Sequence, residues 1–435
     1  MMGHIRNNLS FSLLILTVFL LPVAQIKTEV WGLPVYAPEW AVLGALGAFL
    51  WQFWPVFSQK EWLCFPDRLL SLGVLFFLLG AVLSFMSNPF SLTGLGMIKS
   101  WFFFPALFGV LLWYQLQESN RLRILLVSWF ISLCGVALWS LRSFFGERLT
   151  YDGRLAGQYD SPNFLAYFIA PGIFLALYLL FEAKERFSKR IFLVFVPIGI
   201  GLVTIGSVIF LTRSYSVWTA SLAALLVFSL SAFLILSKTA SFSSLVKEKL
   251  LFLPLLLCIV GGSFFLFDQG SEKWQALVQY DDRSSLSSRL MIWQSARMIS
   301  DDHPIFGIGV GRFQEEYLAY QRFFPPYLEW AVPEPHNFFL ALFLATGVLG
   351  VFGFLLGVGR LGYLFVQGVF FQGVSQEKRL FGAFLIALWV LFFIYGVADT
   401  PYFKTDLAYS FFLLFAFSLS LLEKKTLALG SECKG

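Results

Sequence analysis

Long apolar runs alternate with polar segments along the whole chain, and this pattern predicts the fold. About twelve of the runs approach the roughly 20 residues that a helix needs to cross a hydrocarbon core about 30 Å thick. We therefore expect an all-α polytopic membrane protein with about twelve transmembrane helices, in which residues 1–435 form one membrane domain. The runs cover approximately residues 8–26, 38–57, 68–86, 97–116, 122–141, 162–181, 191–211, 215–236, 250–267, 337–358, 380–398 and 405–422.

Two polar segments, roughly 142–161 and 268–335, are much longer than the other connections. Connections of that length are usually functional or disordered. The second segment is rich in aromatic residues, which favours a folded extracytoplasmic cap rather than a flexible tail. These residues are Trp274, Trp293, Tyr317, Phe323, Phe324, Tyr327 and Trp330.

The cap contains a candidate amphipathic helix over 287–300. Pro304 limits this helix, because the residue before a proline disfavours helical geometry. Three glycines then predict an irregular turn, and a second helix is expected over 313–321. Three side chains of the first helix share a stripe by their spacing: Arg289, Trp293 and Arg297.

The run that follows the cap begins after Pro335-His336-Asn337. His336 and Gly347 are about three helical turns apart, so we expect both on one helix face. Further glycines continue that face and would let another helix approach closely. They are Gly350, Gly353 and Gly357.

Composition and charge agree with a membrane protein. Hydrophobic residues make up 58% of the chain and charged residues 13%. More than half of the 31 lysines and arginines fall in loops on one side of the predicted spans, which predicts that both termini are cytoplasmic. The net charge of +5 then reflects topology and contact with anionic lipid, and it does not argue for nucleic acid binding.

None of the four cysteines lies in the two long outer segments. Cys134 and Cys258 fall in predicted spans, and Cys64 and Cys433 fall on the inner side. We therefore expect no disulfide and no cysteine metal site.

His336 is the first candidate for chemistry, because it lies at a junction between polar loop and apolar helix. It could simply cap the helix and anchor it at the interface. Alternatively, a neutral imidazole could accept a proton from a sugar hydroxyl, since the ordinary imidazole pKa of about 6.5 suits a general base.

Three arginines on the outer side are the next candidates. Arg213 lies between two apolar runs, and Arg154 and Arg289 lie in the two long segments. Each could be a solvated or snorkelling charge. Together they could hold a diphosphate, because guanidinium groups bind phosphate oxygens bidentately. Acids outnumber bases in 268–335, so an anion there needs particular arginines.

Asp160-Ser161-Pro162-Asn163 predicts a helix start, with cap residues followed by proline in the first turn. The N–H groups of such an end attract anions, although a plain structural cap is the simpler interpretation.

These segments resemble the O-antigen ligase and O-antigen polymerase superfamily of membrane proteins. Residues 289–311 are similar to the loop before the family signature, residues 157–166 to its middle segment, and residues 211–214 to a span end that carries a functional arginine. One departure is that Tyr215 stands where that arginine often falls. The resemblance covers about 150–430, and its signature is His336-Asn337-x9-Gly347-x2-Gly350.

The resemblance implies a GT-C-like, metal-independent and inverting glycosyltransferase without a cofactor. It would move a glycan from an undecaprenyl diphosphate carrier to an acceptor hydroxyl at the outer face of the cytoplasmic membrane. The acceptor would be a glycan, a lipid or a protein. The implied catalytic residues are His336, Arg289 and Arg213, and the implied substrate-binding residues are Arg154, Asn337 and Asn163.

Several alternatives stay open at this point. A polymerase, which adds repeats to another lipid-linked chain, shares the architecture of a ligase. A lipid-glycan transporter would be expected to show an inverted repeat and charges deep in several spans, and neither is evident. A non-catalytic partner in envelope assembly is the third class.

Overall fold

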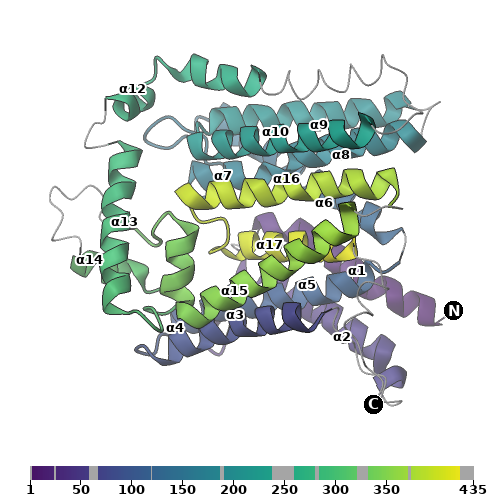
Figure 1. The fold of residues 1–435 in the computed structure, drawn as a ribbon, viewed down its shortest axis with the longest axis horizontal. Coiled ribbons are helices and arrows are strands. Elements are labelled where there is room, and N and C mark those ends of the chain that lie inside the picture. Colours follow the sequence, from purple (N-terminus) through teal and green to yellow (C-terminus); the bar gives the residue numbers. More distant parts are fainter. Residues whose placement is uncertain are drawn as a thin grey trace. The chain divides into compact units, whose positions relative to one another are not determined.

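The computed structural model describes residues 2–23, 26–57, 67–118, 120–186, 191–237, 259–279, 284–320, 332–370 and 374–421. Helices make up most of these residues (Figure 1). Eight helices of this described chain are long and apolar enough to cross a membrane, by length and composition. This architecture is typical of a polytopic membrane protein and agrees with the all-α prediction except for one two-stranded sheet, β1 (Lys27–Val30) and β2 (Leu33–Tyr36).

Eight of the predicted runs coincide with these candidate spans, which are Arg68–Met86, Leu92–Gln115, Arg121–Phe145, Pro162–Glu182, Leu193–Leu211, Tyr215–Ile235, Phe338–Gly368 and Gln376–Ala398. The other four runs fall on helices that do not meet this criterion over their described residues. They are α1 (Met2–Leu20), α2 (Ala37–Phe57), the helix at Ile259–Asp268 and α17 (Thr405–Ser420). The number of twelve spans therefore stays a prediction.

The chain divides into two compact units. The first comprises Met1–Leu125, Ala276–Gly368 and Tyr402–Gly435, and the second comprises Leu126–Gln275 and Val369–Pro401. Besides α1, α2 and α17, the first unit contains β1 (Lys27–Val30), β2 (Leu33–Tyr36), α3 (Arg68–Met86), α4 (Leu92–Ile98), a π-helical turn (Lys99–Phe103), α5 (Phe104–Gln115), α13 (Ser285–Asp302), α14 (Phe313–Tyr320) and most of α15 (Phe338–Phe370).

Glycines let α3 and α15 of the first unit pack almost backbone to backbone. A Cβ added to Gly80 would lie 2.3 Å from the amide nitrogen of Gly350, and one added to Gly353 would lie 2.2 Å from that of Phe77. Side chains at these positions would force the helices apart, so the expected close approach of another helix to the glycine face is confirmed, and that helix is α3.

A second contact between these helices lies further along α15. Arg360 donates from Nε and Nη2 to the two carboxylate oxygens of Asp67, at 3.1 and 2.8 Å. Burial opposes ionisation of Asp67, but the hydrogen bonds from Arg360 and from the Leu70 amide outweigh it and hold the pKa of Asp67 below its usual range. The predicted apolar run ended at residue 358, whereas α15 continues to Phe370 and so includes Arg360.

Aromatic side chains fill the core of the first unit. Tyr402 is fully buried, contacts the rings of Phe77 and Phe102, and donates a hydrogen bond to the carbonyl oxygen of Trp101 at 2.5 Å. Phe338, at the start of α15, packs on the ring of Phe354. The first turn of α15 is thereby anchored in this aromatic core.

The second unit contains most of α6 (Arg121–Phe145) and the helix at Ile259–Asp268, together with α7 (Pro162–Ile169), α8 (Pro171–Arg186), α9 (Ile191–Leu211), α10 (Tyr215–Ser237) and α16 (Gln376–Ala398). The most extensive contact between two helices of this unit joins α10 and α16 (Figure 1). Ser161 caps α7 through its side chain, and Pro162 follows, as the sequence predicted. Tyr167 of α7 stacks on Tyr395 of α16, with ring centroids 4.3 Å apart.

Candidate functional site

His336 lies just before α15 in an unusual backbone conformation. Its φ is 47°, and only four non-glycine residues of the described chain have a positive φ. The carbonyl oxygen of His336 accepts a hydrogen bond from the indole Nε1 of Trp293 at 3.3 Å. A left-handed residue costs roughly 1–2 kcal/mol, and residues held in this way cluster at functional sites.

Asn337 is the residue that caps α15. Its side-chain Oδ1 accepts hydrogen bonds from the amides of Phe339 and Leu340, at 3.0 and 3.1 Å. This satisfies two of the N–H groups that a helix leaves open at its start. The alternative in which His336 caps the helix is therefore wrong. The substrate-binding role of Asn337 stays a prediction.

Arg289 lies on α13, one helical turn before Trp293, and both side chains are half-buried. Residues at this spacing share a helix face. Since the indole of Trp293 reaches the carbonyl of His336, the fold brings Arg289 and His336 to the same part of the first unit. Arg297, one further turn along the stripe, is exposed.

The cap packs α13 and α14 onto the first half of α15. Ala296 and Tyr317 are fully buried there, and Leu344 of α15 belongs to the same apolar cluster. Helix α13 runs from Ser285 to Asp302 and ends at His303, close to the predicted limits of 287–300. The predicted residue 321 of the second helix lies outside the described residues.

The glycine turn after α13 fits into a break in α15. Gly347 has φ 63° and ψ −169°, so the helix is interrupted there. The amides of Ile308 and Gly309 donate to the carbonyl of Leu344 at 2.8 and 3.2 Å, and the amide of Val348 donates to the carbonyl of Ile305 at 2.9 Å. Backbone amide and carbonyl groups that the break would leave without hydrogen bonds are thus paired with groups of the turn.

The fit of the glycine turn into the break of α15, an interlock of two backbone segments, requires glycine at particular positions. Cβ atoms added to Gly307 and Gly347 would each lie 2.4 Å from a carbonyl oxygen of the opposite segment. The interlock ties the end of α13 to α15, and thus helps to position Arg289 relative to His336. The expectation that His336 and Gly347 share one continuous helix face is wrong, because α15 begins after His336 and breaks at Gly347.

Arg154 lies in the loop between α6 and α7 and contacts the link between α9 and α10. Its Nε donates to the carbonyl of Thr212 at 2.8 Å, and its Nη2 donates to Oδ1 of Asn163 at 2.7 Å. Its Nη1 lies 3.6 Å from a carboxylate oxygen of Asp152. Arg154 therefore holds the link between the helices, and its predicted contact with a diphosphate stays a prediction.

Asn163 joins three parts of the second unit. Besides Arg154, its Oδ1 accepts from the hydroxyl of Ser214 at 2.9 Å. Its Nδ2 donates to Oδ2 of Asp399 at 3.1 Å. Asp399 is 1% exposed and is the C-cap residue of α16. Asn163 thus lies at the centre of a half-buried network, and its contact with a substrate stays a prediction.

Arg213 lies in the predicted link between α9 and α10, again with a positive φ, 46°. Its Nε lies 3.4 Å from Oδ1 of Asp268, and its side chain is 44% exposed whereas that of Asp268 is 6% exposed. Tyr215 donates from its hydroxyl to the other oxygen of Asp268. Lys273 donates to the carbonyl of Arg213. The structure therefore brings Arg154, Asn163 and Arg213 together in the second unit.

Asp268 and Asp399 were not among the candidates from the sequence. Asp268 is the last residue of an apolar helix, and Asp399 precedes Thr400-Pro401 just after α16. Their partners lie far away in the chain, at residues 213 and 163. No local pattern distinguishes such residues from solvated carboxylates.

The sequence comparisons bear on this arrangement. Residues 200–355 match the family model of the O-antigen ligases, Wzy_C. The predicted resemblance is thereby confirmed for this stretch. No curated protein matches the chain. Arg213, Arg289, His336 and Asn337 lie inside the matched residues, and Arg154 and Asn163 lie outside them.

The match supports a glycosyltransferase-like function of the ligase or polymerase type, in a membrane protein of polysaccharide biosynthesis. The family implies a lipid-linked glycan and an acceptor as partners.

Proposed function

We propose that the protein transfers a glycan from an undecaprenyl diphosphate carrier to an acceptor hydroxyl at the outer face of the cytoplasmic membrane. The reaction needs no metal and no nucleotide. The observation that carries the proposal is that the family match includes the half-buried His336 and two of the three candidate arginines, Arg213 and Arg289. Two of these residues, Arg213 and His336, are held in left-handed backbone conformations, which supports a functional role.

In the proposed reaction, the acceptor oxygen attacks the anomeric carbon of the glycan. The bond from that carbon to the diphosphate oxygen breaks, and the diphosphate leaves with the electron pair. His336 takes the hydroxyl proton, and the configuration at the anomeric carbon inverts. The family resemblance assigns Arg213 and Arg289 to stabilising the charge that develops on the diphosphate. Arg154 and Asn163 contribute by holding the link that carries Arg213.

The proposal is tested with the purified protein in proteoliposomes that contain a polyprenyl diphosphate-linked glycan and an acceptor. His336→Ala and Arg289→Ala are each expected to lower the transfer rate by about 100-fold or more. Arg297→Ala is the matched control, since Arg297 is exposed on the same helix as Arg289, and should transfer at the wild-type rate.

Each variant is also checked for insertion and thermal melting, so that loss of folding is recognised. Wild-type transfer by a well-folded His336→Ala protein would refute the catalytic role and point instead to a partner in envelope assembly.

Ligase and polymerase differ in the intermediate that accumulates when the enzyme is missing. We propose ligase activity, so deletion of the gene should leave long lipid-linked chains in the membrane. Accumulation of single lipid-linked repeats would show instead that the enzyme is the polymerase. The measurement is the length distribution of the extracted lipid-linked glycans.

A further inference from the structure

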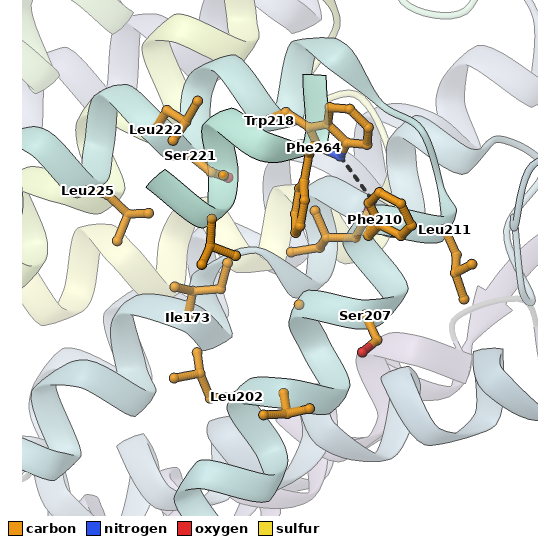
Figure 2. A pocket seen from close by; sticks show the side chains of 15 residues that line it. Ile173, Leu202, Ser207, Phe210, Leu211, Trp218, Ser221, Leu222, Leu225 and Phe264 are labelled. Carbon is orange, nitrogen blue, oxygen red and sulfur yellow. Dashed lines mark hydrogen bonds between the residues drawn. The ribbon is translucent and has the colours of Figure 1, made fainter. Parts of the chain in front are cut away.

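The second unit contains an apolar cavity of about 520 Å³ between α9, α10 and the helix at Ile259–Asp268. Figure 2 shows apolar side chains around it, such as Phe210, Phe264 and Leu225. The described residues that line it include no charged or titratable side chain, so the cavity wall offers no group for acid–base chemistry. Polar contacts with the cap lie instead in the first unit, at the end of α3.

Asn88 lies in the short connection between α3 and α4 and contacts the glycine turn of residues 303–311. Its Nδ2 donates to the carbonyl oxygen of Ser84 at 2.7 Å and to that of Gly307 at 3.3 Å. Its Oδ1 accepts a hydrogen bond from Nη1 of Arg312 at 3.4 Å. A side-chain amide can donate to carbonyls and accept from a guanidinium group at the same time, whereas a carboxylate only accepts.

The glycine turn is thus held from two sides. On one side its backbone is hydrogen-bonded to both halves of the broken helix α15. On the other side lie Asn88 and α4, and a Cβ added to Gly94 of α4 would lie 3.0 Å from the carbonyl oxygen of Val310. Because the turn is closely packed between these neighbours, its position depends on both of them.

The turn follows directly after α13 and therefore fixes the end of that helix. The amide of Gly307 donates to the carbonyl of His303, the C-cap residue of α13, at 3.2 Å. Figure 1 shows this end of α13 next to α4. A helix transmits a displacement along its length, so a shift of the turn also moves Arg289 and Trp293. Trp293 is the residue that donates to the carbonyl of His336.

We infer that Asn88 is a positioning residue for the proposed glycan transfer. Through the glycine turn it holds α13 in the place where Trp293 supports His336 and where Arg289 lies in the same part of the unit. The inference rests on the proposed function and extends the site to a residue outside the matched residues 200–355. Since Asn88 acts on other side chains and not on the substrate, its substitution should slow the reaction step and leave substrate affinity unchanged.

The test uses the isosteric variant Asn88→Asp in the full chain, in the proteoliposome transfer reaction. The new carboxylate still accepts from Arg312 but cannot donate to the carbonyl of Gly307. We expect kcat to fall by about tenfold or more at an unchanged KM for the lipid-linked donor, because small displacements of catalytic groups lower the rate even when their cause is remote. Asn88→Ala removes the same donor without adding a charge, and it serves as the second variant if Asn88→Asp does not fold.

Asp67→Asn is the matched control, an isosteric exchange at the opposite end of α3. It weakens the two hydrogen bonds from Arg360 and should lower the melting temperature at least as much as Asn88→Asp does. Its kcat should equal that of the wild type. If Asn88 only stabilised the fold, kcat would instead follow the melting temperature in both variants.

Hydrogen exchange measures the position of the turn without any transfer reaction. The amides of Ile308 and Val348 form bonds that join the turn to α15. In both Asn88 variants they should exchange about threefold to tenfold faster, which corresponds to the loss of one hydrogen bond. In Asp67→Asn they should exchange at the wild-type rate.

Three outcomes overturn the inference: wild-type kcat in a folded Asn88 variant, an equal loss of kcat in Asp67→Asn, or a rise in KM alone, which would assign Asn88 to substrate binding. Unchanged exchange of both amides would also overturn it, because Asn88 would then not hold the turn. If the wild-type protein transfers no glycan, the proposed function fails, and the exchange of the two amides still decides whether Asn88 holds the turn.

Discussion

At the scale of single residues, Arg213 and His336 share a backbone feature that their side chains do not reveal. Both adopt a positive φ, 46° and 47°, although neither is a glycine. Arg213 lies two residues after the end of α9, and His336 lies two residues before the start of α15. An arginine and a histidine in such positions accept strain that a glycine would avoid, which is the pattern expected where the side chain is needed for function.

This strain leads to a prediction about stability. His336→Gly should be more stable than His336→Ala by about 1 kcal/mol, because glycine adopts the left-handed conformation without the steric cost that alanine meets. Both variants should lack transfer activity. The measurement is the melting temperature of each purified variant in the same detergent. Equal melting temperatures would show that the backbone at residue 336 relaxes when the side chain is removed.

Sequence reasoning selected candidate residues for chemistry but not the residues that support them in the fold. His336 and Arg213 stood out because titratable groups are scarce beside apolar runs, and Arg289 stood out because it shares a helical stripe with Trp293 in the long outer segment. Asp268 and Asp399 are buried only because helices from distant parts of the chain surround them. Burial of that kind comes from tertiary packing and leaves no local pattern.

At the scale of elements, local signals predicted helix limits well. Ser284 caps α13 and Pro304 follows its end, and the observed helix differs from the predicted one by two residues at each end. Two features were missed. The β1–β2 hairpin turns at Trp31-Gly32, both with positive φ, which is the geometry of a tight hairpin turn. The break in α15 escaped prediction because it depends on residues 303–311.

The interlock at that break predicts opposite effects for two glycines of α15. Gly347→Ala should lower the free energy of unfolding by about 1–3 kcal/mol, since it combines a positive φ with a steric overlap. Gly359→Ala is the control: its Cβ has open space, and alanine in a helix interior should stabilise by roughly 0.5–1 kcal/mol. Thermal melting in detergent measures both changes. A neutral Gly347→Ala would contradict the tight fit between the turn and α15.

At the scale of the whole molecule, composition and hydropathy were enough to predict a helical membrane protein. They were not enough to count its spans, because short helices such as α17 and two-part helices such as α7 and α8 differ little in composition from single long ones. The family signature at 336–350 and the preceding loop at 289–311 lie within the matched residues, whereas the middle segment at 157–166 lies outside them.

The distribution of lysine and arginine predicts the orientation of the chain. In a variant whose four cysteines are replaced by serine, Gln294→Cys on α13 should react with a membrane-impermeant maleimide added outside spheroplasts. Lys378→Cys, near the start of α16, should react only after the membrane is opened, because basic loops are retained inside. The reverse labelling pattern would invert the topology and remove the cap from the extracytoplasmic side.

The fit between residues 303–311 and the break in α15 also bears on biosynthesis. A ribosome produces the glycine turn before it produces α15, so the turn exists when the helix first meets lipid. Carbonyl and amide groups exposed by a break find no water in hydrocarbon and need protein partners. Ile305, Ile308 and Gly309 supply those hydrogen-bond partners, and they belong to the segment that is synthesised first. The backbone groups at the break of α15 therefore have their partners available as soon as the helix is synthesised.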